Sequence, residues 1–156
     1  MRPKRRCDTT APSQRCAGPL APDLALSLNN LANVLNDLGR REEALAAAEE
    51  AVRHYRALAA ARPDVFGVDL ARSLWVLGDW HGETGEPDTA IAMLAEAVQL
   101  LTPILTAVPA AVAEMMAGLV QNYHRQCEAA GREPEAEMLG PVIAEFERLN
   151  ATEEEK

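Results

Sequence analysis

Aromatic residues are scarce in this sequence: two Trp, two Tyr and two Phe make up 4% of its 156 residues. Hydrophobic residues nevertheless account for 48% of the chain, so a core must be built mainly from Ala, Leu and Val. A β-sandwich normally needs more β-branched and aromatic side chains, whereas closely packed helices accept small aliphatic ones. The composition therefore favours an all-α fold, and the length suggests one domain.

Positive charge is also scarce beyond residue 21. The net charge is −9, and residues 1–21 hold five basic residues and one acidic residue, which leaves −13 for residues 22–156. Phosphate binding requires a basic surface, so no nucleic-acid partner is expected. No apolar segment follows Arg5-Arg6, and no stretch approaches the roughly 18 uninterrupted apolar residues of a membrane span. We therefore expect a cytoplasmic location and no membrane partner.

The two ends of the chain differ in charge from each other. Residues 1–18 contain Pro, Ser, Thr and basic side chains without an apolar run, which predicts a disordered basic leader. The alternative is an electrostatic arm that folds back on the acidic body or contacts an acidic surface. Residues 151–156, ATEEEK, predict an acidic tail, which leaves residues 19–150 for a helical domain.

A pattern recurs in this domain at a fixed spacing. The segment DLALSLNNLANVLNDLG at 23–39 is followed by DLARSLWVLGDWHGETG at 69–85. Two sets of small residues are spaced by 46 positions: Gly39, Gly85 and Gly131, and Ala44, Ala90 and Ala136. A period of this size indicates a stacked repeat array. The predicted units are about residues 19–62, 63–108 and 109–150.

Each unit is predicted to form two helices. The first helix of the first unit carries one apolar stripe: Leu24, Leu28, Leu31, Leu35 and Leu38. The second has its own stripe: Ala44, Leu45, Ala48, Ala51, Val52, Tyr55 and Leu58. A glycine such as Gly39 is the expected stop after each first helix. In the third unit, Gly140-Pro141 predicts a kink or break, after which apolar residues would cap the array.

Small residues at equivalent positions predict a close approach of the paired helices. Ala32 and Gly78 are equivalent in the first helices, and Ala44, Ala90 and Ala136 are equivalent in the second helices. A larger side chain at these positions would push the helices of a pair apart.

The segment SLNNLANVLNDLGRREEALAAAEEAV resembles a tetratricopeptide repeat, whose consensus packing positions are matched by Leu28, Leu31, Ala32, Gly39, Ala44 and Ala51. The period of 46 residues exceeds the usual 34 of this family. It looks like the long-helix variant of kinesin-light-chain-type repeats, of which LNNLA is typical. Repeats this rich in Ala, Leu and Arg are common in high-GC bacteria. Over about residues 20–150, the resemblance implies a right-handed α-solenoid of three antiparallel helix hairpins.

The resemblance also implies where a ligand would bind, because the first helices of such repeats line a concave groove. When the family's groove positions are transferred to this sequence by the repeat register, they fall on eight residues: Asn29, Asn33, Asn36, Arg72, Trp75, Asp79, Gln121 and Arg125. Asn side chains donate and accept at once, so they suit the backbone of an extended peptide. Trp75 would anchor an apolar side chain, and Arg72 with Arg125 would hold a carboxylate. Asn30 and Asn122 are expected to be structural instead.

No catalytic motif is present, and neither a catalytic residue nor a cofactor is predicted. His81, His124 and Cys127 offer three metal ligands in principle, because His124 and Cys127 are three residues apart on one helical face. We favour the interpretation that all three fill packing positions between neighbouring first helices, so no metal site is predicted.

The sequence therefore predicts a non-catalytic module that binds a peptide or partner protein in the groove of a tetratricopeptide array. The alternative is a sensory or regulatory component of a larger bacterial signalling system, acting with a separate NTPase or transcription regulator. The partner itself is not identified, and a homo-oligomer through the ends of the array is left open.

Overall fold

The computed structural model describes residues 22–154, with side chains up to residue 151. The predicted basic leader, residues 1–18, lies outside this part of the chain. Within it, the secondary structure is helical: α1 (Pro22–Asp37), α2 (Arg41–Ala61), α3 (Pro63–Glu83), α4 (Pro87–Ala107), α5 (Pro109–Ala129) and α6 (Ala136–Glu154). The prediction of an all-α fold is confirmed, and α6 extends into the segment predicted as an acidic tail.

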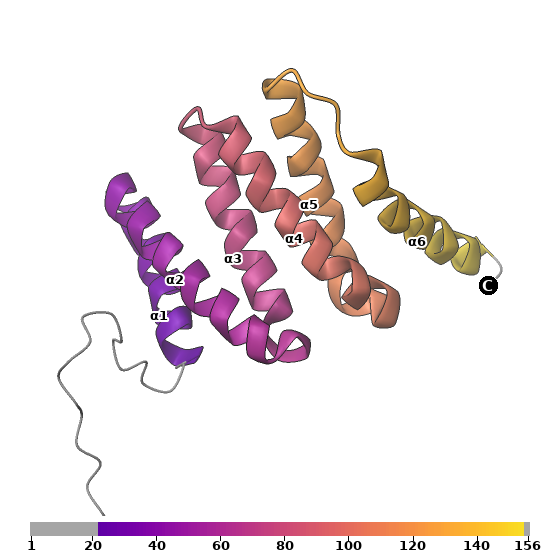
Figure 1. Ribbon diagram of the computed structural model, residues 1–156, viewed down its shortest axis with the longest axis horizontal. Coiled ribbons are helices and arrows are strands. Elements are labelled where there is room, and N and C mark those ends of the chain that lie inside the picture. Colours follow the sequence, from indigo (N-terminus) through magenta and orange to yellow (C-terminus); the bar gives the residue numbers. More distant parts are fainter. Residues whose placement is uncertain (1–21, 155–156) are drawn as a thin grey trace, which may run out of the picture.

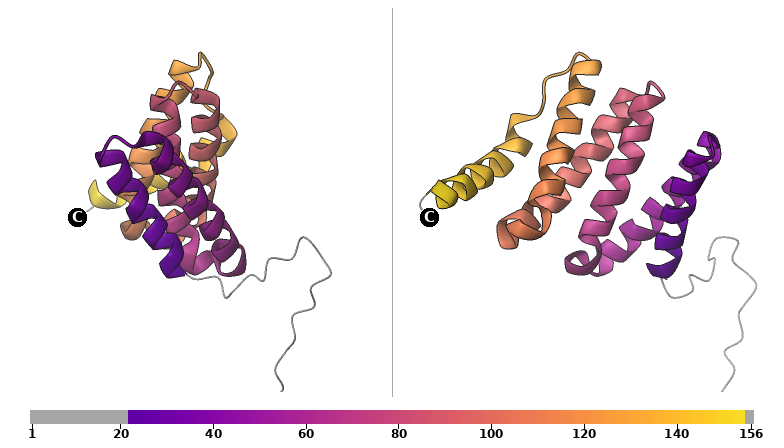
Figure 2. Two further views of the ribbon diagram at one scale, coloured as in Figure 1. Left: turned by 90° about the vertical axis from the view of Figure 1, so that its left-hand side faces the viewer. Right: turned by 180° about the vertical axis from the view of Figure 1, so that it is seen from behind.

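The helices are stacked side by side in chain order (Figures 1 and 2). Each of the first four helices packs against the next, and α3 also contacts α5. The exception is α6, which packs on α4 and diverges from α5 (Figure 1). The first helices of the three pairs, α1, α3 and α5, therefore form one side of an elongated array.

Glycine and proline set the turns between these helices. Gly39, Gly85 and Gly131 adopt φ angles of 74°, 85° and 63°, the left-handed region that favours glycine after a helix. These three predicted stops are confirmed. Proline occupies the first position of α3, α4 and α5, where its missing N–H has no intrahelical partner to lose.

Small side chains allow close helix packing in the first two pairs. Ala32, Ala44 and Ala90 are almost completely buried, as predicted. A Cβ atom at Gly78 would lie 3.1 Å from Leu94 Cγ and 3.3 Å from the Ala90 carbonyl oxygen. The equivalent prediction for Ala136 is wrong, because the segment after Gly131 carries α6 away from α5 and leaves Ala136 exposed at the helix start.

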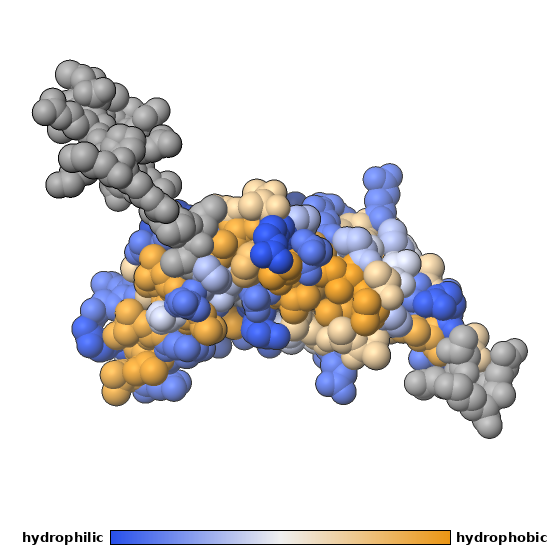
Figure 3. All heavy atoms as spheres, turned by 90° about the horizontal axis from the view of Figure 1, so that it is seen from below, coloured by the Kyte–Doolittle hydropathy of each residue, from blue (hydrophilic) through white to orange (hydrophobic). Residues whose placement is uncertain are grey.

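The predicted apolar stripe of α1 is only partly buried. Leu35 is buried and Leu28 is half-buried, but Leu24, Leu31 and Leu38 are exposed. Ala25 and Ala32 take their place against α2. The reason is that α1 is the first helix in the described array, so one side of it has no preceding helix to cover it. Figure 3 shows hydrophobic residues at the molecular surface among hydrophilic ones.

Two helices contain an internal proline and still run without interruption. Helix α6 continues from Ala136 through Pro141 to Glu154, and the predicted break is therefore absent. Pro103 lies near the end of α4 and is exposed, where one lost hydrogen bond leaves a carbonyl open to water. Beyond Pro141, Val142 is buried, whereas Ile143 is 53% exposed, so the predicted cap covers only part of the array end.

By length and composition alone, α4 could also cross a membrane, because an 18-residue stretch of it has a mean hydropathy of 1.6. The core helix of a folded protein passes the same test. Here the largest apolar side chains of α4, such as Leu94, Leu101 and Leu105, are completely buried between the neighbouring helices. The hydrophobicity of α4 is thus explained by its place at the centre of the array.

Candidate functional site

The predicted groove residues lie together on the side of the array formed by α1, α3 and α5. They line three hollows with volumes of about 150, 520 and 380 Å³, which follow one another from α1 to α5. Asn33 and Arg72 line both the first and the middle hollow, and Trp75 and Asp79 line both the middle and the third. We call this continuous surface the first-helix face; it comprises Asn29, Asn33, Asn36, Arg72, Trp75, Asp79, Gln121 and Arg125.

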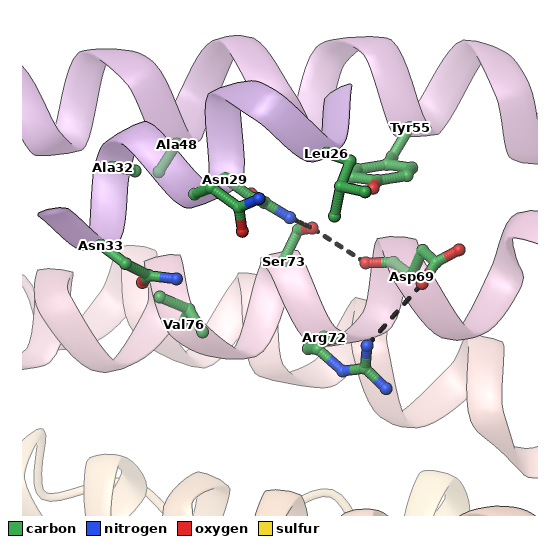
Figure 4. Close-up of a pocket in the computed structure, with 11 residues that line it drawn as sticks. Leu26, Asn29, Ala32, Asn33, Ala48, Tyr55, Asp69, Arg72, Ser73 and Val76 are labelled. Carbon is green, nitrogen blue, oxygen red and sulfur yellow. Dashed lines mark hydrogen bonds and ion pairs between the residues drawn. The ribbon is translucent and has the colours of Figure 1, made fainter. Parts of the chain in front are cut away.

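The first hollow lies between α1, α2 and α3 (Figure 4). Asn29 donates from Nδ2 to Ser73 Oγ over 2.6 Å, and Ser73 donates to the Asp69 carbonyl oxygen over 2.8 Å. The first of these bonds joins α1 to α3 across the boundary between the first two repeat units, and the second holds the Ser73 hydroxyl in place within α3. The amide nitrogen of Asn29 is therefore engaged within the protein, whereas Asn33 is exposed beside it.

Polar and aromatic groups meet at the opposite end of this hollow. Tyr55 reaches it from α2 and lies beside Leu26 of α1 (Figure 4). Burial raises the pKa of Tyr55, and the Asp69 carboxylate raises it further, so the hydroxyl stays protonated at neutral pH and is available as a donor. Arg72 Nη1 lies 3.8 Å from Asp69 Oδ1, a loose and exposed ion pair.

A tighter network connects α3 and α5 at the third hollow. Arg125 donates from Nη2 to Asp79 Oδ1 over 2.5 Å and to Asn122 Oδ1 over 2.6 Å. Asn122 in turn donates to Asp79 Oδ1 over 3.2 Å and is buried, in agreement with its predicted structural role. Asn30, also predicted to be structural, is instead exposed.

The two arginines of the face lie in separate ion pairs. Arg125 is paired with Asp79 and Arg72 with Asp69, and the two arginines line different hollows. Their joint binding of one carboxylate therefore stays a prediction. Each arginine has its own aspartate on α3, which already balances its charge: Asp69 lies three residues before Arg72, and Asp79 faces Arg125 from the neighbouring first helix.

Trp75 occupies the centre of the first-helix face, and its position depends on Gly118. The indole is half-buried and lies over Gly118 of α5, where a Cβ atom would be only 2.6 Å from Trp75 Cη2. Any side chain at residue 118 would therefore displace the ring. The glycine lets the indole lie between α3 and α5, with one part packed and another part facing the two hollows that it lines.

The sequence prediction missed several residues that contribute to this surface. Gly118 shares its repeat position with Leu26 and Arg72, so extending the register of Arg72 by one unit would have found it. Ser73 and Asp69 lie one turn apart on α3, and their roles depend on Asn29 reaching them from α1. Tyr55 belongs to a second helix, and no pattern in its own segment indicates that it lines the hollow.

The three residues considered as metal ligands are used differently. His81 is buried, and its Nδ1 lies 2.7 Å from Glu86 Oε2; its Nε2 has no hydrogen-bond partner within residues 22–151. Cys127 is buried in the core, but His124 is exposed and bonds through Nδ1 to the Val120 carbonyl oxygen. The packing prediction is therefore wrong for His124. Across the described residues, no three His, Cys, Asp or Glu side chains are grouped as metal ligands.

Comparison with known proteins agrees with this architecture. The family model for the tetratricopeptide repeat matches residues 23–102, just over half of the chain, from α1 into α4. No curated protein matches the chain. Domains of this family generally mediate protein–protein interactions and are typically non-catalytic scaffolds. Because the family model matches just over half of the chain and the matched residues form helix pairs, the chain belongs to the tetratricopeptide repeat family.

Proposed function

We propose that this protein is a non-catalytic interaction module that binds an extended segment of a partner protein along the first-helix face. The observation that carries the proposal is the position of Trp75. Its indole is held between α3 and α5 and lines two adjoining hollows. A half-buried tryptophan surrounded by polar groups is the composition typical of energetically important residues in protein interfaces.

The polar groups beside Trp75 suit the backbone of such a segment. Asn33 and Gln121 are exposed on the two sides of Trp75, and the Asn36 side chain lines the middle hollow. Each amide can donate and accept, which matches the alternating N–H and C=O groups of an extended chain. The face thus offers an apolar anchor at its centre and amide groups toward both ends.

Charge supports the choice of a basic or uncharged segment. The aspartates beside Arg72 and Arg125 balance both arginines, so the local charge of the face is nearly neutral. Residues 22–156 as a whole carry a net charge of −13. This field attracts basic segments over distances near the Debye length, about 10 Å at 0.1 M salt, and raises their association rate. Added salt should therefore slow association.

The experiment uses peptides selected from a random display library on the full chain, with binding measured by surface plasmon resonance. Trp75→Ala is expected to raise the dissociation constant of the selected peptides about tenfold, mainly through faster dissociation. Gly118→Ala should also weaken binding, because the added methyl group displaces the indole without removing it. Arg53→Ala, an exposed change on α2, serves as the matched control and should have no effect.

Two results would contradict the proposal. One is unchanged affinity in both Trp75→Ala and Gly118→Ala while both variants keep the circular dichroism spectrum of the wild type. The other is a loss of affinity in Arg53→Ala that equals the loss in Trp75→Ala. Either result would place the binding surface outside the first-helix face.

A further inference from the structure

The outer side of α1 carries a row of exposed large aliphatic residues: Leu24, Leu31, Val34 and Leu38. They are 46%, 48%, 54% and 66% exposed. Residues seven apart lie on the same side of a helix, so Leu24, Leu31 and Leu38 follow one line along α1. We call these four residues the α1 outer face. It is separate from the first-helix face, to which α1 contributes Asn29, Asn33 and Asn36.

The equivalent residues of the other first helices, α3 and α5, are buried rather than exposed. The residues equivalent to Leu24 are Leu70 in α3 and Met116 in α5, which are 3% and 0% exposed. Those equivalent to Leu31 are Leu77 and Tyr123, each 1% exposed. Helix α3 has α2 before it, and α5 has α3 and α4 before it, and each packs against these preceding helices. In α1 the same side has no such neighbour within the described residues.

We propose that a second copy of this chain covers the α1 outer face, so that two α1 helices pack antiparallel about a two-fold axis at Leu31. The spacing of the leucines is self-complementary in that arrangement. Leu31 of one copy meets Leu31 of the other, and Leu24 of each copy meets Leu38 of the other. A two-fold interface requires this kind of self-complementary surface.

Charge at the ends of α1 agrees with the same arrangement. Asp23 precedes Leu24 at one end, and Arg40 follows Leu38 and Gly39 at the other. Antiparallel packing about Leu31 places Asp23 of each copy beside Arg40 of the second copy. Arg40 already bonds to Glu43 over 2.6 and 2.7 Å, so Asp23 would join an existing ion pair at each end of the interface.

Two other occupants fit less well. A head-to-tail array would place α6 of one copy on α1 of the next, but the described side chains of α6 include only one exposed large aliphatic residue, Ile143. Residues 1–21 contain five basic residues, and their large aliphatic residues are Met1 and Leu20 alone. Neither segment supplies enough apolar side chains to match four on the α1 outer face.

The test measures the molecular mass of the full chain by sedimentation equilibrium over a range of concentrations. The wild type is expected to dimerise. Leu31→Glu and Leu31→Lys should each raise the dimer dissociation constant about 100-fold, roughly tenfold for each copy of the substituted leucine. Leu26→Glu, which alters an equally exposed leucine on the other side of α1, is the matched control and should leave the dimer intact.

Mixing the two charged variants tests the two-fold geometry directly. The carboxylate introduced into one copy would then face the ammonium group introduced into the other, so an equimolar mixture of Leu31→Glu and Leu31→Lys should recover the dimer. A monomeric wild type at about 100 µM would overturn the proposal, and so would a dimer that survives Leu31→Glu. Failure of the mixture to recover the dimer would exclude the two-fold α1 interface in favour of another occupant.

Discussion

Replacing Leu94 with alanine is expected to lower the free energy of unfolding by about 2–5 kcal/mol. Leu94 is completely buried in α4, and its Cγ atom would lie 3.1 Å from a Cβ atom at Gly78, so it packs closely against the glycine. Because α4 packs against α3, α5 and α6, a cavity at this position affects the centre of the array rather than one end. Chemical denaturation monitored by circular dichroism measures the loss.

The matched control is Leu26→Ala on α1. Leu26 is 53% exposed, so its removal should change the free energy of unfolding by less than about 0.5 kcal/mol. Equal effects of Leu94→Ala and Leu26→Ala would mean that α4 does not lie at the centre of the fold. For a chain of this size, the expected loss at Leu94 corresponds to a Tm decrease of roughly 10 °C.

Enlarging the buried alanines should also destabilise the protein. Ala44→Leu and Ala90→Leu are each expected to cost about 3 kcal/mol, near the upper end for overpacked cores. Both alanines are completely buried, and the carbonyl oxygen of Ala90 would lie 3.3 Å from a Cβ atom at Gly78 on α3. The extra side-chain atoms have no space unless the two helices separate. Thermal unfolding of the full-length variants measures the effect.

The chain offers the same substitution at exposed positions as a control. Ala46 on α2 and Ala92 on α4 lie two residues beyond Ala44 and Ala90, and both side chains are exposed. Ala46→Leu and Ala92→Leu should therefore each leave the melting temperature nearly unchanged. If Ala90→Leu and Ala92→Leu behave alike, the assigned register of the second helices is incorrect.

The internal repeat made much of the fold predictable, because each unit repeats the same turn and packing chemistry. Gly39, Gly85 and Gly131 predicted the three helix stops, and all three adopt positive φ angles. The repeat could not show where the array ends. Leu24 and Leu70 occupy equivalent positions with the same residue type, yet among residues 22–154 only Leu70 lies on a helix that packs against a preceding one. Burial depends on neighbours in space, which periodicity alone does not specify.

The candidate site was predictable to a similar degree. The register placed Asn33, Trp75 and Arg125 on one face, since equivalent positions of a stacked array point the same way. It could not predict the ion pair between Arg125 and Asp79, because side-chain pairing across repeats depends on distances between helices. The register does reach Gly118, which is equivalent to Arg72, but its contact with Trp75 depends on the distance between α3 and α5.

The most direct test of the interaction surface is a map of the backbone amides that respond to a bound peptide. Two-dimensional ¹H–¹⁵N NMR spectra of the labelled full chain, recorded with and without a display-selected peptide, provide that map. The proposed function predicts that the largest shifts fall on α1, α3 and α5, around Asn33, Trp75 and Gln121, and are absent when the protein carries Trp75→Ala. Shifts confined to the exposed sides of α2, α4 and α6 would contradict it.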